Sequence, residues 1–262
     1  MEQTPAVNPM SLAGRTIIVT GAGQGIGRAI AELVVALGGN AVVADVNSAV
    51  LEEARGAFPP GRFLGVEANI ADPAAVQAMV DQAADAFGAV HGLVNNAGIT
   101  RPAMIEKMTL EQWNQVLGVH LTGAFLCTQA VGRHMIERAK AGDANPGAIV
   151  NISSDAGVQG TVGQVNYATA KAGILGTTMS AAREWAKYGV RVNCVAFGVV
   201  ETPMTEVIRG EKFRDTYLSR IPLGRFSTPE EVARPVCFLL SEAASFITGQ
   251  RISVNGGMQM AV

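Results

Sequence analysis

The chain has 262 residues, of which 48% are hydrophobic and only 16% are charged, so a large share of its surface must be buried. Its net charge is −2 without any cluster of Lys or Arg, which excludes the electrostatic footprint of a protein that binds nucleic acid or an anionic membrane.

Targeting and cysteine signals are absent from the sequence. No stretch reads as a membrane span, and the first ten residues lack the basic and apolar regions of a secretory signal. The three cysteines, Cys127, Cys194 and Cys237, are odd in number and far apart, which argues against a disulfide framework and against a metal site. We therefore expect a cytoplasmic protein with reduced core thiols and no metal.

Short apolar runs rich in β-branched residues alternate with helical patterns along the whole chain. These runs, each typical of a strand buried on both faces, lie at 16–20, 41–44, 63–66, 92–95, 148–152, 190–195 and 251–254. Helix start signals lie between them: Asp72 before Pro73, Thr109 with Gln112, and Thr228 before Pro229 with Glu231. The pattern predicts an α/β fold, a seven-stranded parallel doubly wound sheet with helices on both faces.

Nothing in the chain marks a second domain, since we find no repeat, low-complexity tract or linker. We expect a flexible arm at residues 1–11 and one domain at 12–262. The segment at about 199–220 is long and poorly periodic after a predicted strand, which suggests a mobile lid over a site.

A glycine-rich turn joins the first predicted strand to the first predicted helix. Gly21, Gly25 and Gly27 allow a tight turn whose backbone can approach a pyrophosphate, which the positive end of the helix then holds. As a bare pattern, the turn could equally be a tight connection. Its spacing is G-x-x-x-G-x-G, not the G-x-G-x-x-G of many dinucleotide-binding folds.

Asp45 ends the second predicted strand, close to twenty residues after the glycines, where a carboxylate can bind the hydroxyls of an adenosine ribose. The alternative is a turn-forming aspartate, since Asn47 and Ser48 follow and can start a helix. Gln24 is uncharged where a basic residue could have met a 2′-phosphate. We therefore favour NAD(H) as the cofactor over NADP(H).

Three polar residues in the second half form the candidate catalytic group. Tyr167 and Lys171 are four residues apart on a predicted helix that reaches about Lys187, so they share one face. A nearby ammonium group favours the phenolate of a tyrosine whose ordinary pKa is about 10. Ser154 follows the predicted strand at 148–152, at the edge where open α/β sheets bind ligands. Without Ser154, the Tyr and Lys pair would most often be a solvated helix face.

From about Leu12 to Met260 the chain resembles the short-chain dehydrogenase/reductase family, a family of Rossmann-type domains. The matching motifs are Thr20-Gly21-x-x-x-Gly25-x-Gly27, Asn95-Asn96-Ala97-Gly98, Ser154 and Tyr167-x-x-x-Lys171. The segment after Gly224 is most similar to the bacterial 3-oxoacyl thioester reductases of that family.

The resemblance implies a role for each matching residue. Tyr167 would protonate the forming alkoxide, Ser154 would orient the carbonyl, and Lys171 would hold the nicotinamide ribose and lower the pKa of Tyr167. The implied cofactor contacts are Gly21, Gln24, Gly25, Ile26, Gly27, Asp45, Asn69, Ile70, Asn96, Ala97, Gly98, Tyr167, Lys171, Val200 and Thr202.

The resemblance also implies a homotetramer that acts on a small carbonyl or alcohol substrate. A 3-oxoacyl thioester is the first expectation for that substrate. The alternatives are a small secondary alcohol or sugar alcohol, and a non-catalytic protein that only binds the dinucleotide.

The chain departs from the family pattern at four positions. His120 stands where an asparagine usually helps to relay protons; it either serves that relay or is a buried histidine satisfied by packing. Phe197 replaces a proline before Gly198. Asn145 and Tyr188 align at or near the two basic positions at which the carrier-protein reductases dock their partner, which weakens the expectation of a carrier-protein substrate.

Overall fold

A computed structural model describes residues 8–260 of the chain. Its seven strands form one parallel sheet in the order β3-β2-β1-β4-β5-β6-β7. The strands are β1 (Thr16–Thr20), β2 (Asn40–Asp45), β3 (Phe63–Glu67), β4 (Gly92–Asn95), β5 (Ala148–Ser154), β6 (Arg191–Phe197) and β7 (Arg251–Val254). The strand order reverses between β1 and β4, which is where open α/β sheets bind their ligands.

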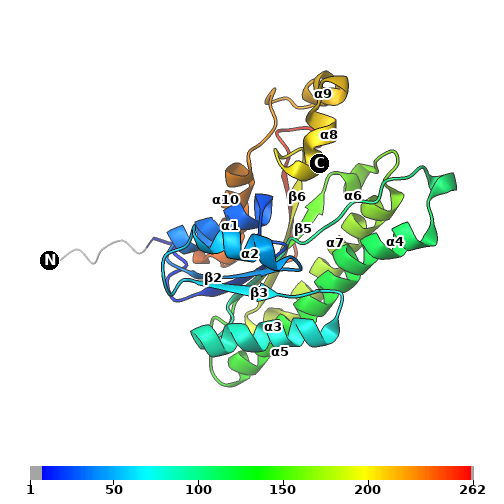
Figure 1. Ribbon diagram of the computed structural model, residues 1–262. Helices are drawn as coiled ribbons and strands as arrows, with labels where there is room; N and C mark the ends of the chain where they lie inside the picture. The colour runs from blue at the N-terminus through cyan, green and yellow to red at the C-terminus, as the bar shows by residue number, and fades with distance from the viewer. Residues whose placement is uncertain (1–7, 261–262) are drawn as a thin grey trace.

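Helices cover both faces of this sheet (Figure 1). They are α1 (Gly25–Ala36), α2 (Ser48–Arg55), α3 (Pro73–Phe87), α4 (Leu110–Leu117), α5 (Ala124–Lys140), α6 (Ala156–Gln159), α7 (Val165–Trp185), α8 (Glu206–Arg209), α9 (Glu211–Leu218) and α10 (Pro229–Leu240). The predicted seven-stranded, doubly wound parallel sheet is thereby confirmed. None of the helices in residues 8–260 is long and apolar enough to cross a membrane.

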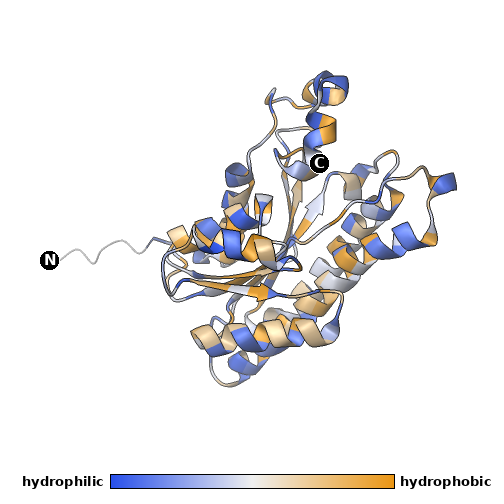
Figure 2. Cartoon of the chain, viewed as in Figure 1, coloured by the Kyte–Doolittle hydropathy of each residue, from blue (hydrophilic) through white to orange (hydrophobic). Residues whose placement is uncertain are grey.

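Two hydrophobic cores lie on the two faces of the sheet. Alternate residues of each strand point in opposite directions, so Ile17 and Val19 of β1 join the core under α1, α2 and α10, whereas Ile18 joins the core under α3, α5 and α7. Figure 2 shows hydrophobic colour concentrated on the strands and on the inner helix faces. Burial on both faces explains why the strands read as continuous apolar runs.

The predicted helix starts are confirmed. The Asp72 side chain accepts a hydrogen bond from Ala74 N at the start of α3. Thr109 and Thr228 each form a capping box, with Gln112 and Glu231 respectively, at the start of α4 and α10. The three cysteines are free and buried, as expected.

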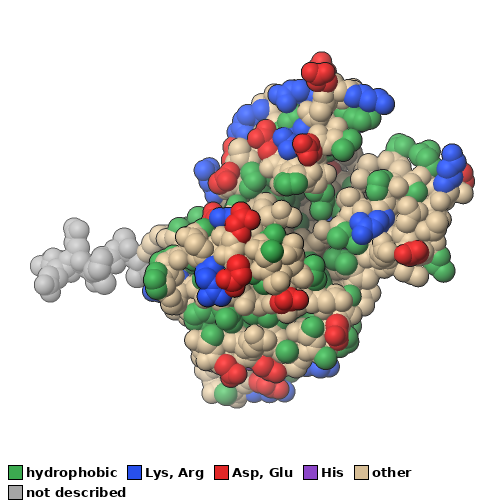
Figure 3. Space-filling view, in the orientation of Figure 1, with side chains coloured by type: hydrophobic (Ala, Val, Ile, Leu, Met, Phe, Trp, Pro, Cys, Tyr) green, Lys and Arg blue, Asp and Glu red, His purple; other side chains and the backbone are tan. Residues whose placement is uncertain are grey.

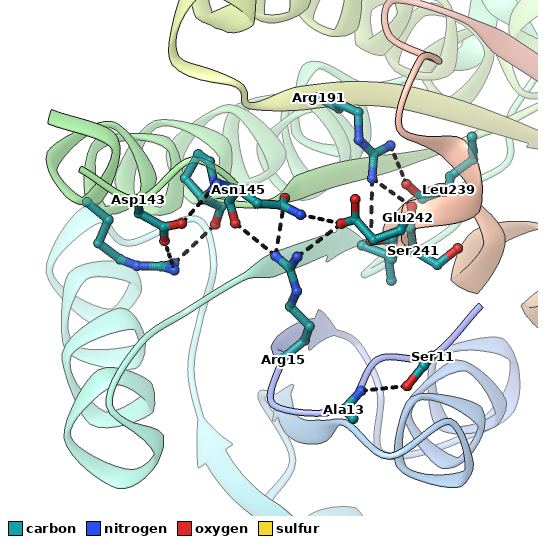
Figure 4. Close-up of polar contacts among 12 residues, drawn as sticks. Ser11, Ala13, Arg15, Asp143, Asn145, Arg191, Leu239, Ser241 and Glu242 are labelled. Atoms are coloured by element: carbon teal, nitrogen blue, oxygen red, sulfur yellow. Dashed lines mark hydrogen bonds and ion pairs between the residues drawn. The ribbon is translucent and has the colours of Figure 1, made fainter. Parts of the chain in front are cut away.

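A polar network closes the amino-terminal end of the sheet (Figure 4). Arg15 donates to Asn145 O at 2.9 Å and forms an ion pair with Glu242 at 3.0 Å, and the Asn145 side chain also donates to Glu242. Arg191 donates to Leu239 O at 2.7 Å, at the end of α10. Asn145, one of the two positions aligned with the docking residues, is thus held within the chain itself.

The two segments that we expect to be mobile, the arm and the lid, both make contacts with other residues of the protein. Most of the predicted arm, residues 1–7, lies outside the described residues; further along, Pro9 O accepts a hydrogen bond from Ala243 N at 2.9 Å. The segment at 199–220 contains α8 and α9, and its apolar side chains pack around Val199, Ile221 and Phe226.

Candidate active site

A cavity of about 380 Å³ opens at the carboxyl-terminal edge of the sheet, and this volume lies within the usual range of cofactor and small-molecule sites. Figure 3 shows the surface hollowed between the lobe that carries α8 and α9 and the lobe that carries α4. The structure brings every residue predicted for the site to this cavity: Gly21, Gln24, Gly25, Ile26, Gly27, Asp45, Asn69, Ile70, Asn96, Ala97, Gly98, His120, Ser154, Tyr167, Lys171, Val200 and Thr202.

The glycine turn between β1 and α1 forms one end of the cavity. Gly21 and Gly25 have φ angles of +62° and +57°, a backbone conformation that favours glycine. A Cβ on Gly27 would lie 2.5 Å from Gly21 O, so only glycine allows the helix to start this close to the strand. Gln24, the N-cap of α1, makes no side-chain cap, which leaves the first-turn N–H groups suited to a pyrophosphate.

Asp45 lies at the end of β2, beside this turn. Its carboxylate accepts hydrogen bonds from Gly23 N and from Asn47 N, both at 3.2 Å, and Asn47 in turn caps α2. The contact with Asn47 is the one expected of a turn-forming aspartate, while the place of Asp45 on the cavity wall is the one expected of a ribose ligand. The two interpretations are therefore compatible.

Asn96 connects the loop after β4 to the glycine turn by hydrogen bonds. Its side-chain amide donates to Thr20 O at 3.0 Å and to Gly21 O at 3.1 Å. The Thr20 hydroxyl accepts hydrogen bonds from the N–H groups of Asn96 and Ala97, each at 3.1 Å. Hydrogen bonds within the protein thus hold together the residues around the expected dinucleotide, which suits the cofactor.

Tyr167, Lys171 and Ser154 lie together at the other end of the cavity. Ser154 is the last residue of β5, so the strand is longer than the predicted one. Lys171 Nζ donates to Ile152 O at 2.7 Å and lies 5.7 Å from the centroid of the Tyr167 ring. The contact between the ammonium group and this carbonyl fixes Lys171 on the floor of the cavity beside Tyr167.

The acid–base properties of this group are set mainly by burial. Burial raises the pKa of Tyr167, against the opposing effect of a hydrogen bond with Ser154. Burial also lowers the pKa of Lys171 to about 8. Burial is the larger of these two causes of the Tyr167 shift, and Lys171 is not among them. The lowering of the tyrosine pKa by Lys171 therefore stays a prediction.

His120 lies in a π-helical turn, Gly118–Gly123, and is 4% exposed. Its Nε2 lies 2.9 Å from Ile99 N and 2.8 Å from Ile99 O, and its ring meets the Tyr167 ring edge-on at 5.1 Å. Burial, and next the charge of Lys171, lower the pKa of His120 to about 3, so the ring is neutral. Within residues 8–260, Nδ1 has no hydrogen-bond partner.

These contacts leave both interpretations of His120 open. Nε2 is satisfied, as packing requires, whereas the unpartnered Nδ1 is free to accept or donate a proton, as a relay requires. A Cβ on Gly98 would lie 2.2 Å from His120 Cε1, so the glycine makes room for the ring. No group of three or more potential metal ligands occurs in the described part of the chain.

Sequence reasoning missed part of the cavity wall. Ile99, Val119, Pro203 and Met204 add apolar surface. Ser153, whose hydroxyl donates to Lys171 O at 2.7 Å, ties β5 to α7. Because Ser153 is next to Ser154, the sequence could have indicated that Ser153 belongs to the site. The four apolar residues belong to no motif that would have indicated them.

The fold and the cavity define an oxidoreductase that uses a nicotinamide dinucleotide. Residues 21–259 match the family described as enoyl-(acyl carrier protein) reductase. The chain belongs to the short-chain dehydrogenase/reductase family, whose enzymes act on CH-OH groups with NAD(P).

The chain is similar along nearly its whole length to named relatives. It is 42% identical to the 3-oxoacyl-(acyl-carrier-protein) reductase FabG of Thermotoga maritima and 44% identical to that of Aquifex aeolicus, in each case over 95% of this chain and 99% of the relative. A crystal structure from Brucella melitensis, described as a short-chain dehydrogenase/reductase and glucose/ribitol dehydrogenase, superposes with a TM-score of 0.88 at 32% identity, covering 95% of this chain and 98% of the other.

Proposed function

We propose that the protein reduces the ketone of a 3-oxoacyl thioester to a secondary alcohol, with Tyr167 as the catalytic acid. The observation that carries this proposal is the convergence of Ser154, Tyr167 and Lys171 at one end of a cavity whose other end is the glycine turn. The bound nicotinamide would supply or accept the hydride.

The chemistry of the protein's own residues follows from their environments. Because its pKa is raised, Tyr167 keeps its phenolic proton at neutral pH and can donate it to the oxygen of a carbonyl that is being reduced. Ser154 would donate a hydrogen bond to the same oxygen and hold it beside the phenol. Lys171, held by Ile152 O, would bind the nicotinamide ribose and add positive charge near the forming alkoxide.

We propose NAD(H) as the preferred cofactor. The Asp45 carboxylate would accept hydrogen bonds from the ribose hydroxyls and would repel a 2′-phosphate. Arg28 is the nearby cation that could offset this repulsion, but it is paired with Glu32 at 2.9 Å and lies 3.9 Å from Glu53. Both acidic partners compete with a phosphate for Arg28, which supports the choice of NAD(H).

The substrate assignment rests on the relatives and on exposed apolar side chains in the segments after β5 and β6. The curated relatives are named as reductases of 3-oxoacyl carrier-protein substrates. Met204, an exposed apolar side chain, lines the cavity, and Val158, Val162 and Val207 are exposed in the segments after β5 and β6; such apolar surface suits an acyl chain better than a polyol. A small secondary alcohol or sugar alcohol is the second candidate, favoured by the likeness to the Brucella melitensis structure, which is described as a glucose/ribitol dehydrogenase.

We further propose that residues 12–262 form one domain, that 199–220 act as its lid, and that the protein is a cytoplasmic homotetramer. Phe125 on α5 and Met179 on α7 are 48% and 52% exposed in the single chain, and such apolar side chains on neighbouring helices suit a subunit contact. The low content of charged residues supports the same conclusion.

A substrate panel followed by NADH absorbance tests the function. The panel contains 3-oxoacyl-CoA, the same acyl group on acyl carrier protein, and ribitol or sorbitol with NAD in the oxidative direction. We expect the highest kcat/KM for a 3-oxoacyl thioester. A higher kcat/KM for a polyol would establish the alternative, and no turnover of any substrate would contradict both.

A further inference from the structure

Asn166, the residue before Tyr167, is a fully buried polar side chain whose amide oxygen and amide nitrogen are both hydrogen-bonded inside the protein. It is 0% exposed. Its Oδ1 accepts the N–H of Tyr167 at 2.8 Å, and its Nδ2 donates to Arg101 O at 3.0 Å and to Gln112 O at 3.1 Å. The N-cap of α7, Gln164, makes no side-chain cap, so Asn166 satisfies a first-turn N–H that would otherwise lack a partner.

The two carbonyl groups bound by Asn166 belong to two other elements, the loop after β4 and helix α4. A second contact supports this junction, since Ala103 N donates to Gly163 O at 2.9 Å beside a short parallel bridge between Ala103 and Gln164. Arg101 Nε also donates to Gln115 Oε1 on α4 at 2.8 Å. The start of α7, the loop and α4 therefore form one connected unit.

We infer that Asn166 is a positioning residue that fixes Tyr167 relative to the loop at 99–104, and this inference rests on the proposed role of Tyr167 as the acid. The same loop holds His120 through Ile99, so both rings that meet at 5.1 Å depend on it. Asn166 lies outside the residues that line the cavity, and so it acts through Tyr167.

Two substitutions remove the hydrogen bonds of Asn166 to different degrees. Asn166→Asp keeps the acceptor for the Tyr167 N–H but sets a carboxylate oxygen against the carbonyls of Arg101 and Gln112, which repels both. Asn166→Ser is milder, because the shorter hydroxyl cannot reach both carbonyls. A displacement of about 1 Å at a reacting group can cost on the order of 100-fold in rate. We expect kcat per folded subunit to fall by about 10-fold to 100-fold.

A matched control separates positioning from simple loss of stability. Asn193 on β6 is also 0% exposed, and its amide donates to Ile247 O at 2.8 Å and accepts from Gln250 N at 3.0 Å. Asn193→Asp removes a comparable buried amide, whose hydrogen-bond partners are not those of Asn166 or Tyr167. We expect it to lower the melting temperature but to leave kcat per folded subunit within about twofold of wild type, as for sites with no shared partners.

The experiment measures kcat, the KM of the carbonyl substrate and the Kd of NADH by fluorescence, with the folded fraction taken from circular dichroism. A fall in kcat for both Asn166 variants, with the Kd of NADH unchanged and Asn193→Asp active, supports the inference. Wild-type kcat in Asn166→Ser, or an equal fall in Asn193→Asp, overturns it. Tyr167→Phe is measured alongside, and wild-type turnover in that variant would overturn the proposed function itself.

Discussion

Replacing His120 by Asn should reduce the loss of stability that the protein suffers in mild acid. The imidazole is buried beside Lys171, and its folded-state pKa is about 3, against 6.5 for a free histidine. A depressed pKa means that the unfolded chain binds a proton before the folded chain does. The stability that a neutral buried His120 contributes is therefore fully present above pH 6.5 and is lost as the pH falls from 6.5 towards 3.

The size of this effect follows from the two pKa values. At pH 5 the unfolded histidine lies 1.5 units below its pKa of 6.5 while the folded one is still neutral, so the folded state loses about 2 kcal/mol relative to pH 8. His91, whose pKa is lowered to about 4, contributes a similar loss that is common to both proteins. The difference between wild type and His120→Asn therefore isolates one residue.

Urea unfolding at pH 8 and pH 5, at one protein concentration and one salt concentration, measures this difference. Fixed protein concentration is needed because the subunit association proposed above would add to the apparent stability. We expect the wild type to lose about 2 kcal/mol more than His120→Asn between the two pH values. An equal loss in both proteins would show that His120 is not a buried neutral histidine in solution.

Three further changes test other parts of the site and the fold. Tyr167→Phe should leave folding and NADH binding intact but reduce kcat by about 10²-fold to 10⁴-fold, as expected for a lost acid; near-normal turnover would refute that role. Asp45→Ser should reduce the ratio of kcat/KM for NADH to that for NADPH by about tenfold or more, since a hydrogen bond to a charged group contributes about 1.5 to 3 kcal/mol; an unchanged ratio would dismiss Asp45 as its cause. Thr228→Ala should lower the free energy of unfolding by about 1 kcal/mol through the lost cap of α10, measured by urea unfolding, and no change would mean that the cap is dispensable.

The strands were predictable to within one or two residues because each is a short apolar run buried on both faces. The exact ends of the strands were less predictable. β5 and β6 extend two residues past the predicted runs, where Ser153 pairs with Ala196 and Ser154 with Phe197. Hydrogen bonds to a neighbouring strand, and not the local sequence, decide where such strands stop. The helices α8 and α9 were missed for the same reason, since their stability comes from packing around Ile221 and Phe226.

The motifs indicated the residues that meet at the cavity. Three of the four motifs end or follow a strand, and the carboxyl ends of parallel strands meet at one edge, whereas Tyr167 and Lys171 come from α7. What the motifs could not identify were contacts between distant positions. Asn166 binds carbonyl groups 65 and 54 positions away in the chain, and no periodicity reports such a contact. The close approach of the His120 ring to Gly98 was unpredictable for the same reason.

The raised pKa of Tyr167 bears on the protonation state in which the site meets its substrate at neutral pH. A phenol that keeps its proton at neutral pH is ready to donate to a carbonyl oxygen, whereas the reverse reaction must first take that proton away. Lys171, with a pKa of about 8, is mostly charged at pH 7 and would stabilise a negative oxygen on the substrate. His120 is neutral and so adds no second positive charge. A protonated Tyr167 beside a charged Lys171 therefore suits the carbonyl reduction that we propose from the named relatives.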